Sequence, residues 1–241
     1  MCIRDRPYID VTFDRNKIYN EEIVSSKSVI EITLQDENRD LLLNDTSVFT
    51  LKIKEPGGFP QRIYFGQNNV RFIQASTTDN KVKAIIQGDF TKDGIHTLYV
   101  TAIDGSGNAA TDQDYITDFN IIRKSSVSNL LNYPNPFTSK TRFVYTLTGD
   151  ILPDHYMIQI LTVSGKVVRE ITREELGPLS IGTHMTEFEY NGSDQYGDRL
   201  ANGVYLYRFV VKDKLNKSWD KFDTNTDNYF KNDFGKMVIL R

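Results

Sequence analysis

Short runs that alternate apolar and polar residues, separated by glycine, proline, asparagine and aspartate, recur along the whole sequence. The clearest run is 29–34, where Ile30, Ile32 and Leu34 fall on one side and polar residues on the other, which is typical of a half-buried strand. Turn-forming clusters interrupt the runs about every ten residues. This rhythm predicts antiparallel β-sandwiches. In the first half we expect strands at 29–34, 48–54, 83–87, 97–102 and 115–122.

The second half continues the pattern with a strong hairpin. Residues 156–163 and 167–171 are both rich in β-branched and apolar residues, and the turn between them contains Gly165, which can supply a positive φ. The clearest helical signal is a single turn at 173–176, ended by Gly177. The chain is therefore predicted to be all-β, built from two consecutive immunoglobulin-like antiparallel β-sandwiches. Further strands are expected at 141–147, 185–190, 203–211 and 237–241.

The segment between the halves is irregular. Pro134 and Pro136, two residues apart, each hold φ at about −65° and lack a backbone donor, so the segment fits neither a helix nor a central strand. It predicts an extended segment that separates two folding units and is anchored by Tyr133 and Phe137. A small, polar stretch precedes it, and we expect this stretch to be a solvated linker open to proteases. The linker residues are Arg123, Lys124, Ser125, Ser126, Val127 and Ser128.

The expected domains are 7–122 and 130–241, joined by a linker at 123–129. Each has about 110 residues, enough to bury a core that folds alone. Residues 1–6 resemble translated sequencing-adapter DNA, so we expect them to be non-native and the native chain to begin before Pro7. The single cysteine, Cys2, lies among them. The native part is then expected to hold neither a disulfide nor a thiolate site.

Composition excludes several classes of partner. The formal net charge is −3, so the chain offers no basic field for nucleic acid or an anionic membrane. No stretch approaches the roughly 18 apolar residues of a membrane-spanning helix. Aromatic residues make up 12% of the chain, which together with many valines, isoleucines and threonines favours sheet over helix.

Residues 93–108 contain a strand, Gly94-Ile95-His96-Thr97-Leu98-Tyr99, followed by the turn Ala102-Ile103-Asp104-Gly105-Ser106-Gly107-Asn108. This segment is similar to the last hairpin of bacterial immunoglobulin-like modules, in which a D-G-x-Y-x-L strand precedes an A-x-D-x-x-G-N turn. The aromatic residue of the strand is displaced here. The resemblance covers about half of the first domain and implies an immunoglobulin-like sandwich for it.

Four segments of the second half carry a more specific combination. Residues 132–137 read N-Y-P-N-P-F, 162–168 read T-V-S-G-K-V-V, 190–205 read Y-N-G-S-D-Q-Y-G-D-R-L-A-N-G-V-Y, and 235–241 read G-K-M-V-I-L-R. Together they resemble the opening, hairpin, loop and closing motifs of the type A C-terminal sorting domain of proteins exported by the type IX secretion system of Bacteroidetes. Two departures are Thr162-Val163, where an aspartate is commoner, and Tyr190, where the family has tryptophan.

The resemblance implies a non-catalytic C-terminal region of a secreted cell-surface protein. Such a region crosses the periplasm, is recognised by the outer-membrane translocon, and is cleaved by a sortase near the linker. The passenger is then attached to surface lipopolysaccharide. It also implies that Arg241 is the true C-terminus. The residues expected to carry the sorting signal are Asn132, Tyr133, Pro134, Asn135, Pro136, Phe137, Gly165, Lys166, Gly197, Gly203, Val204, Tyr205, Lys236 and Arg241.

Catalytic and metal-binding patterns are weak. His96, His155 and His184 are far apart in sequence, and we expect them to be packed or exposed without a shared function. The turn at Gly165 lacks the Gly-x-Ser-x-Gly pattern of a nucleophile elbow. Residues 223–228 space oxygens as a calcium loop does, but lack its glycine and glutamate, so a polar hairpin loop is expected. No cofactor or metal is predicted.

Other functions stay open at this point. The missing N-terminal passenger could be a gingipain-type cysteine peptidase, or the chain could be the tail of a sortase subunit. A pair of adhesive or carbohydrate-binding sandwiches would favour surface tryptophan and tyrosine, yet the only tryptophan, Trp219, lies in a charged loop. Flagellar hook-capping domains share the same core pattern, and an assembly factor of that kind would need flagellar partners. The sorting interpretation is preferred because it accounts for all four motifs.

Overall fold

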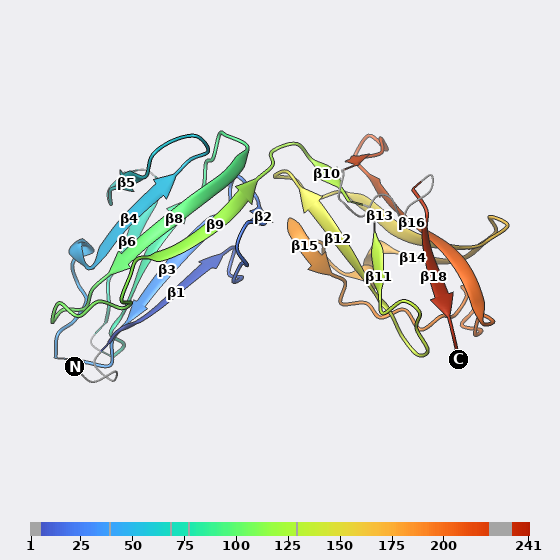
Figure 1. Cartoon of the computed structure of the whole chain (residues 1–241), viewed down its shortest axis with the longest axis horizontal. Helices are drawn as coiled ribbons and strands as arrows, with labels where there is room; N and C mark the ends of the chain where they lie inside the picture. The colour runs from blue at the N-terminus through green and yellow to red at the C-terminus, as the bar shows by residue number, and fades with distance from the viewer. Residues whose placement is uncertain (1–5, 39, 68, 77, 129, 222–232) are drawn as a thin grey trace. The chain divides into compact units, whose positions relative to one another are not determined.

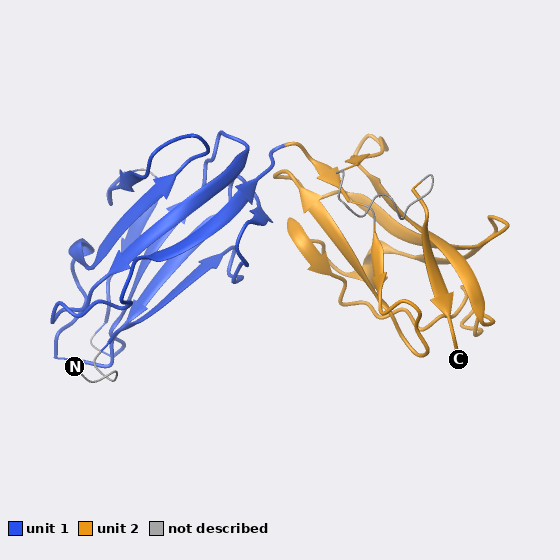
Figure 2. Ribbon diagram, viewed as in Figure 1, with its two compact units in different colours: residues 1–123 blue, residues 124–241 orange. Residues whose placement is uncertain are grey.

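The computed structural model describes residues 6–38, 40–67, 69–76, 78–128, 130–221 and 233–241. The chain forms two compact units, residues 1–123 and 124–241, which Figure 2 colours separately. Each unit is a β-sandwich whose own hydrophobic cluster fills the space between two sheets. The predicted all-β fold class is therefore confirmed.

The first unit stacks a four-stranded sheet, ordered β1-β3-β7-β6, on a five-stranded sheet, ordered β2-β9-β8-β4-β5 (Figure 1). All neighbouring strands are antiparallel except β2 and β9, which run parallel. A 3-10 turn at Thr46–Val48 leads into β4. The strands are β1 (Tyr8–Phe13), β2 (Glu22–Val24), β3 (Val29–Gln35), β4 (Phe49–Lys54), β5 (Gln61–Ile63), β6 (Val70–Ile73), β7 (Lys81–Gln87), β8 (Gly94–Ala102) and β9 (Tyr115–Ile121).

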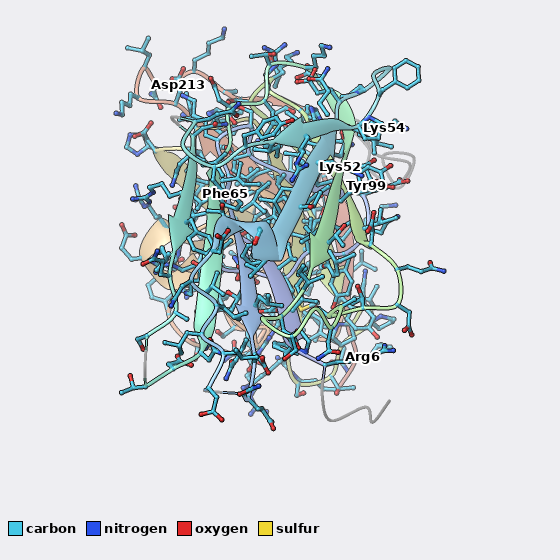
Figure 3. All side chains as sticks on the ribbon, turned by 90° about the vertical axis from the view of Figure 1, so that its left-hand side faces the viewer. Arg6, Lys52, Lys54, Phe65, Tyr99 and Asp213 are labelled. Atoms are coloured by element: carbon cyan, nitrogen blue, oxygen red, sulfur yellow. The ribbon has the colours of Figure 1, made fainter. Side chains whose placement is uncertain are left out.

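The alternation in the sequence decides which side chains of the first unit enter the core. Ile30, Ile32 and Leu34 of β3 have no exposed surface, as predicted. The residues between them face outward. On the other sheet, Lys52 of β4 lies opposite Tyr99 of β8, and Figure 3 labels both on that sheet. Each strand therefore contributes one apolar face, which is the arrangement that a sandwich requires.

A histidine interrupts this apolar core. His96 of β8 is fully buried, stacks on Phe119 with ring centroids 5.4 Å apart, and meets Phe90 edge-on at 5.1 Å. Its Nδ1 lies 3.0 Å from the Gly94 carbonyl oxygen, while Nε2 has no hydrogen-bond partner within the described residues. Burial lowers the pKa of His96 below its ordinary value, which favours the neutral ring in the folded unit.

The second unit packs the sheet β14-β13-β16-β18 against a sheet centred on β12 (Figure 1). β12 pairs with β10 and β11 along one edge of the strand and with β15 along the other, and β10 also pairs in parallel with β17. The strands are β10 (Ser126–Val127), β11 (Leu131–Tyr133), β12 (Arg142–Thr148), β13 (His155–Thr162), β14 (Val167–Ile171), β15 (Gly182–Met185), β16 (Gly203–Lys212), β17 (Asp220–Lys221) and β18 (Gly235–Ile239).

Two local predictions in the second unit have different outcomes. The helical turn is confirmed as α1 (Arg173–Leu176), where the Glu175 carboxylate accepts the Thr172 amide at 3.1 Å and Gly177 ends the turn. The strand expected at 185–190 is wrong, because β15 ends at Met185. The Thr186 hydroxyl accepts the Phe143 amide at 3.1 Å, so a side chain takes the place of a ladder partner there.

Candidate functional site at the closing strand

The closing motif forms β18, an antiparallel partner of β16. Met237 and Ile239 point into the core with no exposed surface, and Lys236 is exposed. In the ladder, Gly203 lies opposite Ile239, Val204 opposite Val238, and Tyr205 opposite Met237. The predicted Gly-Val-Tyr strand and the predicted terminal strand are thus direct neighbours.

The opening motif covers the other edge of β18. The Asn135 side chain donates to the Lys236 carbonyl oxygen at 2.9 Å and accepts the Val238 amide at 3.0 Å. The Phe137 amide donates to the Val238 carbonyl at 3.0 Å, and the Phe137 carbonyl accepts the Leu240 amide at 2.9 Å. An asparagine amide presents the same donor and acceptor as a peptide group, so Asn135 substitutes for a strand residue. Both edges of β18 are therefore hydrogen-bonded.

Arg241 ties the end of β18 to the loop motif. Its guanidinium donates to the carbonyl oxygens of Leu200 at 2.8 Å, Asn191 at 2.7 Å and Gly192 at 3.2 Å. The Asn202 side chain accepts the Arg241 amide and donates to the Arg241 carbonyl, both at 3.0 Å. A guanidinium has five donors in a rigid fork, so it can satisfy several carbonyls that a lysine could not bridge. We call the residues Asn135, Phe137, Asn191, Gly192, Leu200, Asn202 and Lys236–Arg241 the closing corner.

Two glycines make this corner possible. A Cβ atom on Gly192 would lie 2.6 Å from an Arg241 guanidinium nitrogen, and φ at Gly192 is +74°. A Cβ atom on Gly235 would lie 2.3 Å from the buried Tyr207 ring. Sequence reasoning omitted Gly192, Asn202 and Gly235 from the sorting residues. A glycine inside a strand marks a close approach, but the strand was predicted to begin at Met237, so Gly235 was not recognised as part of it.

The opening motif is held from within the second unit. Asn132 is buried, and its side-chain amide donates to the Thr141 hydroxyl at 3.1 Å and the Pro134 carbonyl at 3.3 Å. Phe137 is buried as predicted, and the peptide bonds before Pro134 and Pro136 are both cis. The expectation that Tyr133 anchors the segment is wrong, since Tyr133 is 69% exposed. The segment belongs to the second unit and does not separate the two units.

Of the other residues predicted to carry the sorting signal, Gly165, Lys166 and Gly197 are not part of the closing corner, whereas Tyr205 pairs with Met237 of the corner. Gly165 has φ +88° in the β13–β14 turn, where the Thr162 amide donates to the Lys166 carbonyl at 2.9 Å. Gly197 has φ +92° in a turn closed by Asp194. The Tyr205 hydroxyl donates to the Ala201 carbonyl at 3.1 Å. The structure therefore brings together the opening, loop and closing motifs, and leaves the hairpin motif two strands away across β16.

The predicted solvated linker is wrong for Ser126, Val127 and Ser128. All three are buried, and β10 pairs with both β12 and β17. The Ser126 hydroxyl lies 2.6 Å from that of Thr148, and the Ser128 hydroxyl accepts the Thr146 amide at 2.8 Å. Both serine hydroxyls are hydrogen-bonded, so this polar run can be buried as a strand. The second unit accordingly begins at Lys124.

Arg123 and Lys124 are the exposed part of the predicted linker. Arg123 pairs with Asp93 at 2.8 Å within the first unit, and Lys124 pairs with Asp220 at 3.0 Å within the second. Hydrogen bonding to Arg123 lowers the pKa of Asp93, and hydrogen bonding to Lys124 lowers the pKa of Asp220. Both pairs are solvent-exposed, so each contributes little to stability.

Within the described ranges, no group of three or more histidine, cysteine, aspartate or glutamate side chains could hold a metal ion. His96 lies in the first unit, while His155 and His184 lie on β13 and β15 of the second. The calcium-like run 223–228 falls outside the described residues. No helix in the described part of the chain is long and apolar enough to cross a membrane.

Comparisons with known proteins add the following. No protein-family model matches the chain, and no curated protein matches it. Among solved structures it is similar to dimeric latent PorU from Porphyromonas gingivalis, at 17% identity and a TM-score of 0.37, over 99% of this chain and 20% of that one. It is also similar to the fibronectin(III)-like modules of Clostridium thermocellum CbhA, at 11% identity and a TM-score of 0.26, over 95% and 94% of the two chains. The chain thus spans about a fifth of the PorU structure, and similarity this low carries no argument about function.

Proposed function

We propose that residues 124–241 form a sorting domain that directs a protein through the type IX secretion system to the outer-membrane surface. Residues 1–123 act as a non-catalytic spacer. The observation that carries the proposal is the meeting of the opening, loop and closing motifs on β18. Core packing alone does not require exposed polar contacts at one corner, yet Asn135, Asn202 and Arg241 supply them. A shared recognition surface accounts for why motifs so distant in sequence occur together.

The closing corner is presented as a folded surface. Exposed strand edges recruit partners by adding a strand to the sheet, but both edges of β18 are already bonded. A receptor that extended this sheet would first have to displace Asn135 and Phe137. The proposal is therefore that the translocon reads side chains of the folded corner and its surroundings. The exposed candidates are Tyr133, Lys236, Leu240 and Arg241.

The proposed route starts in the periplasm, where the unit folds without disulfides. The outer-membrane translocon then binds the folded corner, and a sortase separates the passenger from it. Surface lipopolysaccharide receives the passenger. In this account the chain is not an enzyme, and its partners are the translocon and the sortase.

The processing position follows from the buried β10. A protease needs several residues in an extended form, and Ser126–Ser128 would have to leave β12 and β17 first. Arg123 and Lys124 are exposed, precede β10 and belong to neither ladder. Cleavage is therefore proposed at Arg123–Lys124. Mass spectrometry of the surface form should find its last residue there, and recovery of peptides from Phe143 onward would contradict processing.

The experiment for the sorting role uses the chain fused behind a signal peptide and a reporter in a Bacteroidetes host. Surface display is measured by protease accessibility of the reporter on intact cells. Deleting Lys236–Arg241 should leave the reporter in the periplasm. Normal display of the deletion would contradict the proposal.

Point variants separate recognition from folding. Lys236→Ala removes an exposed cation while the backbone bonds of β18 stay, so the unit should fold and display should fall. Lys217→Ala, which removes an exposed lysine from the β16–β17 connection, is the matched control and should be displayed normally. If both variants fold and are displayed alike, the cation of the closing strand has no part in recognition.

A further inference from the structure

The first unit contains a groove that its spacer role does not use. The cavity has a volume of about 360 Å³ and lies where the connections β4–β5, β5–β6 and β7–β8 come together. Ligand sites in proteins commonly measure roughly 300–1,000 Å³ and combine an apolar surface with a few directed polar groups. Here Ile53, Ile63, Ile86 and Phe90 supply the apolar part of the lining. Lys54, labelled in Figure 3, ends β4, and the groove residue Glu55 follows it in the sequence.

One aromatic ring stands at the groove with most of its surface exposed. Phe59, in the connection between β4 and β5, lines the cavity and is 87% exposed. Gly58 and Pro60 flank it, and Gly57 has φ +71°, so the turn that carries the ring is sharply defined. Because the Phe59 ring is exposed, it contributes little hydrophobic stabilisation to the fold of the free protein. Its flat apolar face is therefore available to stack on a ligand.

The polar part of the lining consists mainly of side-chain amides. Gln61, Gln67, Asn69 and Gln87 are all exposed, and none of these side chains makes a hydrogen bond within the described ranges. Each amide offers two donor hydrogens and an acceptor oxygen. They come from several elements around the cavity rather than from one strand edge. Such a set matches a ligand whose hydroxyl groups point in several directions.

The charges at the groove balance. Glu55 and Lys92 form an ion pair at 2.8 Å, and the other two charged residues, Asp89 and Arg62, have opposite signs. Arg62 is also placed over the Tyr64 ring, 5.5 Å from its centroid. Because the formal charges sum to zero, the groove favours neither an anion nor a cation. The preferred ligand is uncharged.

We propose that this groove binds a neutral oligosaccharide. A sugar ring has an apolar face of C–H groups that stacks on an aromatic ring and a rim of hydroxyls that pair with amides, and Phe59 and the four amides supply these two surfaces. The proposal is independent of the sorting role of the second unit. It gives the first unit a binding function in addition to spacing.

Isothermal titration of the full chain with cellohexaose, xylohexaose, mannohexaose and chitohexaose tests the proposal. At least one of the four should bind, and Phe59→Ala should weaken that binding about tenfold, since loss of a stacked aromatic anchor costs roughly 1.4 kcal/mol or more. Tyr19→Ala is the matched control, because Tyr19 is 85% exposed in the same unit and does not line the groove. Both variants remove exposed rings and should fold normally.

Amide resonances measured during the titration locate the site. Shifts should concentrate at Gln61, Gln67, Asn69 and Gln87, and Gln61→Ala should weaken binding about fivefold. No binding by any of the four sugars, equal binding by Phe59→Ala, or shifts elsewhere in the unit would each overturn the proposal. Binding of an extended peptide in the groove, without sugar binding, would assign the site to a protein partner and overturn it as well.

Discussion

The first unit fills its core with aliphatic side chains and phenylalanine, whereas the second also buries four tyrosines, Tyr145, Tyr156, Tyr190 and Tyr207. In the second unit the tyrosine hydroxyls reach specific backbone groups: Tyr156 donates to Gly177 at 2.7 Å and Tyr190 donates to Ser193 at 2.9 Å. Apolar packing tolerates many arrangements, but a buried hydroxyl needs one partner in one place. The second core therefore fixes the loops around it, including the one that Arg241 binds.

The buried histidine of the first unit, unlike these tyrosines, does not fix a loop. His96 is buried, and its Nε2 has no partner among the residues that the structure describes, so it adds a titrating group to the first core without fixing a loop. Two sandwiches of similar architecture thus differ in which polar groups they bury and how those groups are satisfied. This difference predicts that the units respond separately to mutation and in opposite directions to pH.

The largest expected effect tests whether the two cores are independent. Phe119→Ala in the first unit and Phe143→Ala in the second each remove a ring with no exposed surface. Each should lower the free energy of unfolding of its own unit by roughly 3–5 kcal/mol and leave the other unit unchanged. Chemical denaturation followed by hydrogen exchange resolves the two units. A substitution that destabilised both units equally would break the comparison.

Gly235→Ala is expected to have the next largest effect. Its Cβ would lie 2.3 Å from the buried Tyr207 ring, so one of the two must shift, and overpacking should cost about 1–3 kcal/mol. Gly58→Ala is the control, because a Cβ there meets its nearest atom at 3.4 Å. Thermal unfolding of both variants checks this prediction. An unchanged melting temperature for Gly235→Ala would mean that Tyr207 does not hold β18 in the described position.

The pH dependence should differ between the units at acid pH. The pKa of His96 is lowered chiefly by burial; the hydrogen bond with the Gly94 carbonyl and the charge of Glu55 act in the opposite direction, and the charge of Lys92 adds to the lowering. The neutral ring therefore contributes stability that is present above pH 6.5, its ordinary value, and is lost as the pH falls below it. Each unit of difference in pKa corresponds to about 1.4 kcal/mol. His96→Phe, which keeps an aromatic ring without a titrating nitrogen, should abolish this acid sensitivity of the first unit.

At alkaline pH the second unit should be the more sensitive. Burial raises the pKa of Tyr145, Tyr190 and Tyr207 above 10.0. Their contribution is fully present below pH 10 and is lost as the pH rises beyond it, because the unfolded chain releases these protons first. In the first unit Tyr115 shows the same direction but is only partly buried. Urea unfolding midpoints of each unit, measured against pH, test both the acid and the alkaline prediction. The same pH dependence in the two units would contradict the account.

The sequence predicts the long strands well because alternation and burial have the same period. In β3 every predicted inward residue is buried. The short strands are harder. The Ser-Val-Ser run at 126–128 has too few apolar residues to be distinguished from a loop. Its burial depends on the Thr146 amide and the Thr148 hydroxyl as hydrogen-bond partners, which only the folded sheet supplies.

The candidate site was predictable in part. The motifs identify Asn135, Lys236 and Arg241, but not that Asn135 bonds to Lys236 and Val238, which lie 101 and 103 positions later in the chain. Such contacts leave no periodic signal in one sequence. Tyr133 was expected to anchor the opening segment, yet it is the last residue of β11, where Asn132 faces the core and Tyr133 faces outward.

The central claim is that the second unit alone carries the sorting information. The direct measurement fuses residues 124–241 to a periplasmic reporter in a Bacteroidetes host, with residues 1–123 fused to the same reporter as the comparison. Surface exposure is scored by protease accessibility on intact cells, and folding by protease resistance of the periplasmic fraction. We predict that the reporter with residues 124–241 reaches the surface and the reporter with residues 1–123 stays in the periplasm. A folded 124–241 fusion retained in the periplasm, or equal display of both fusions, would contradict the account.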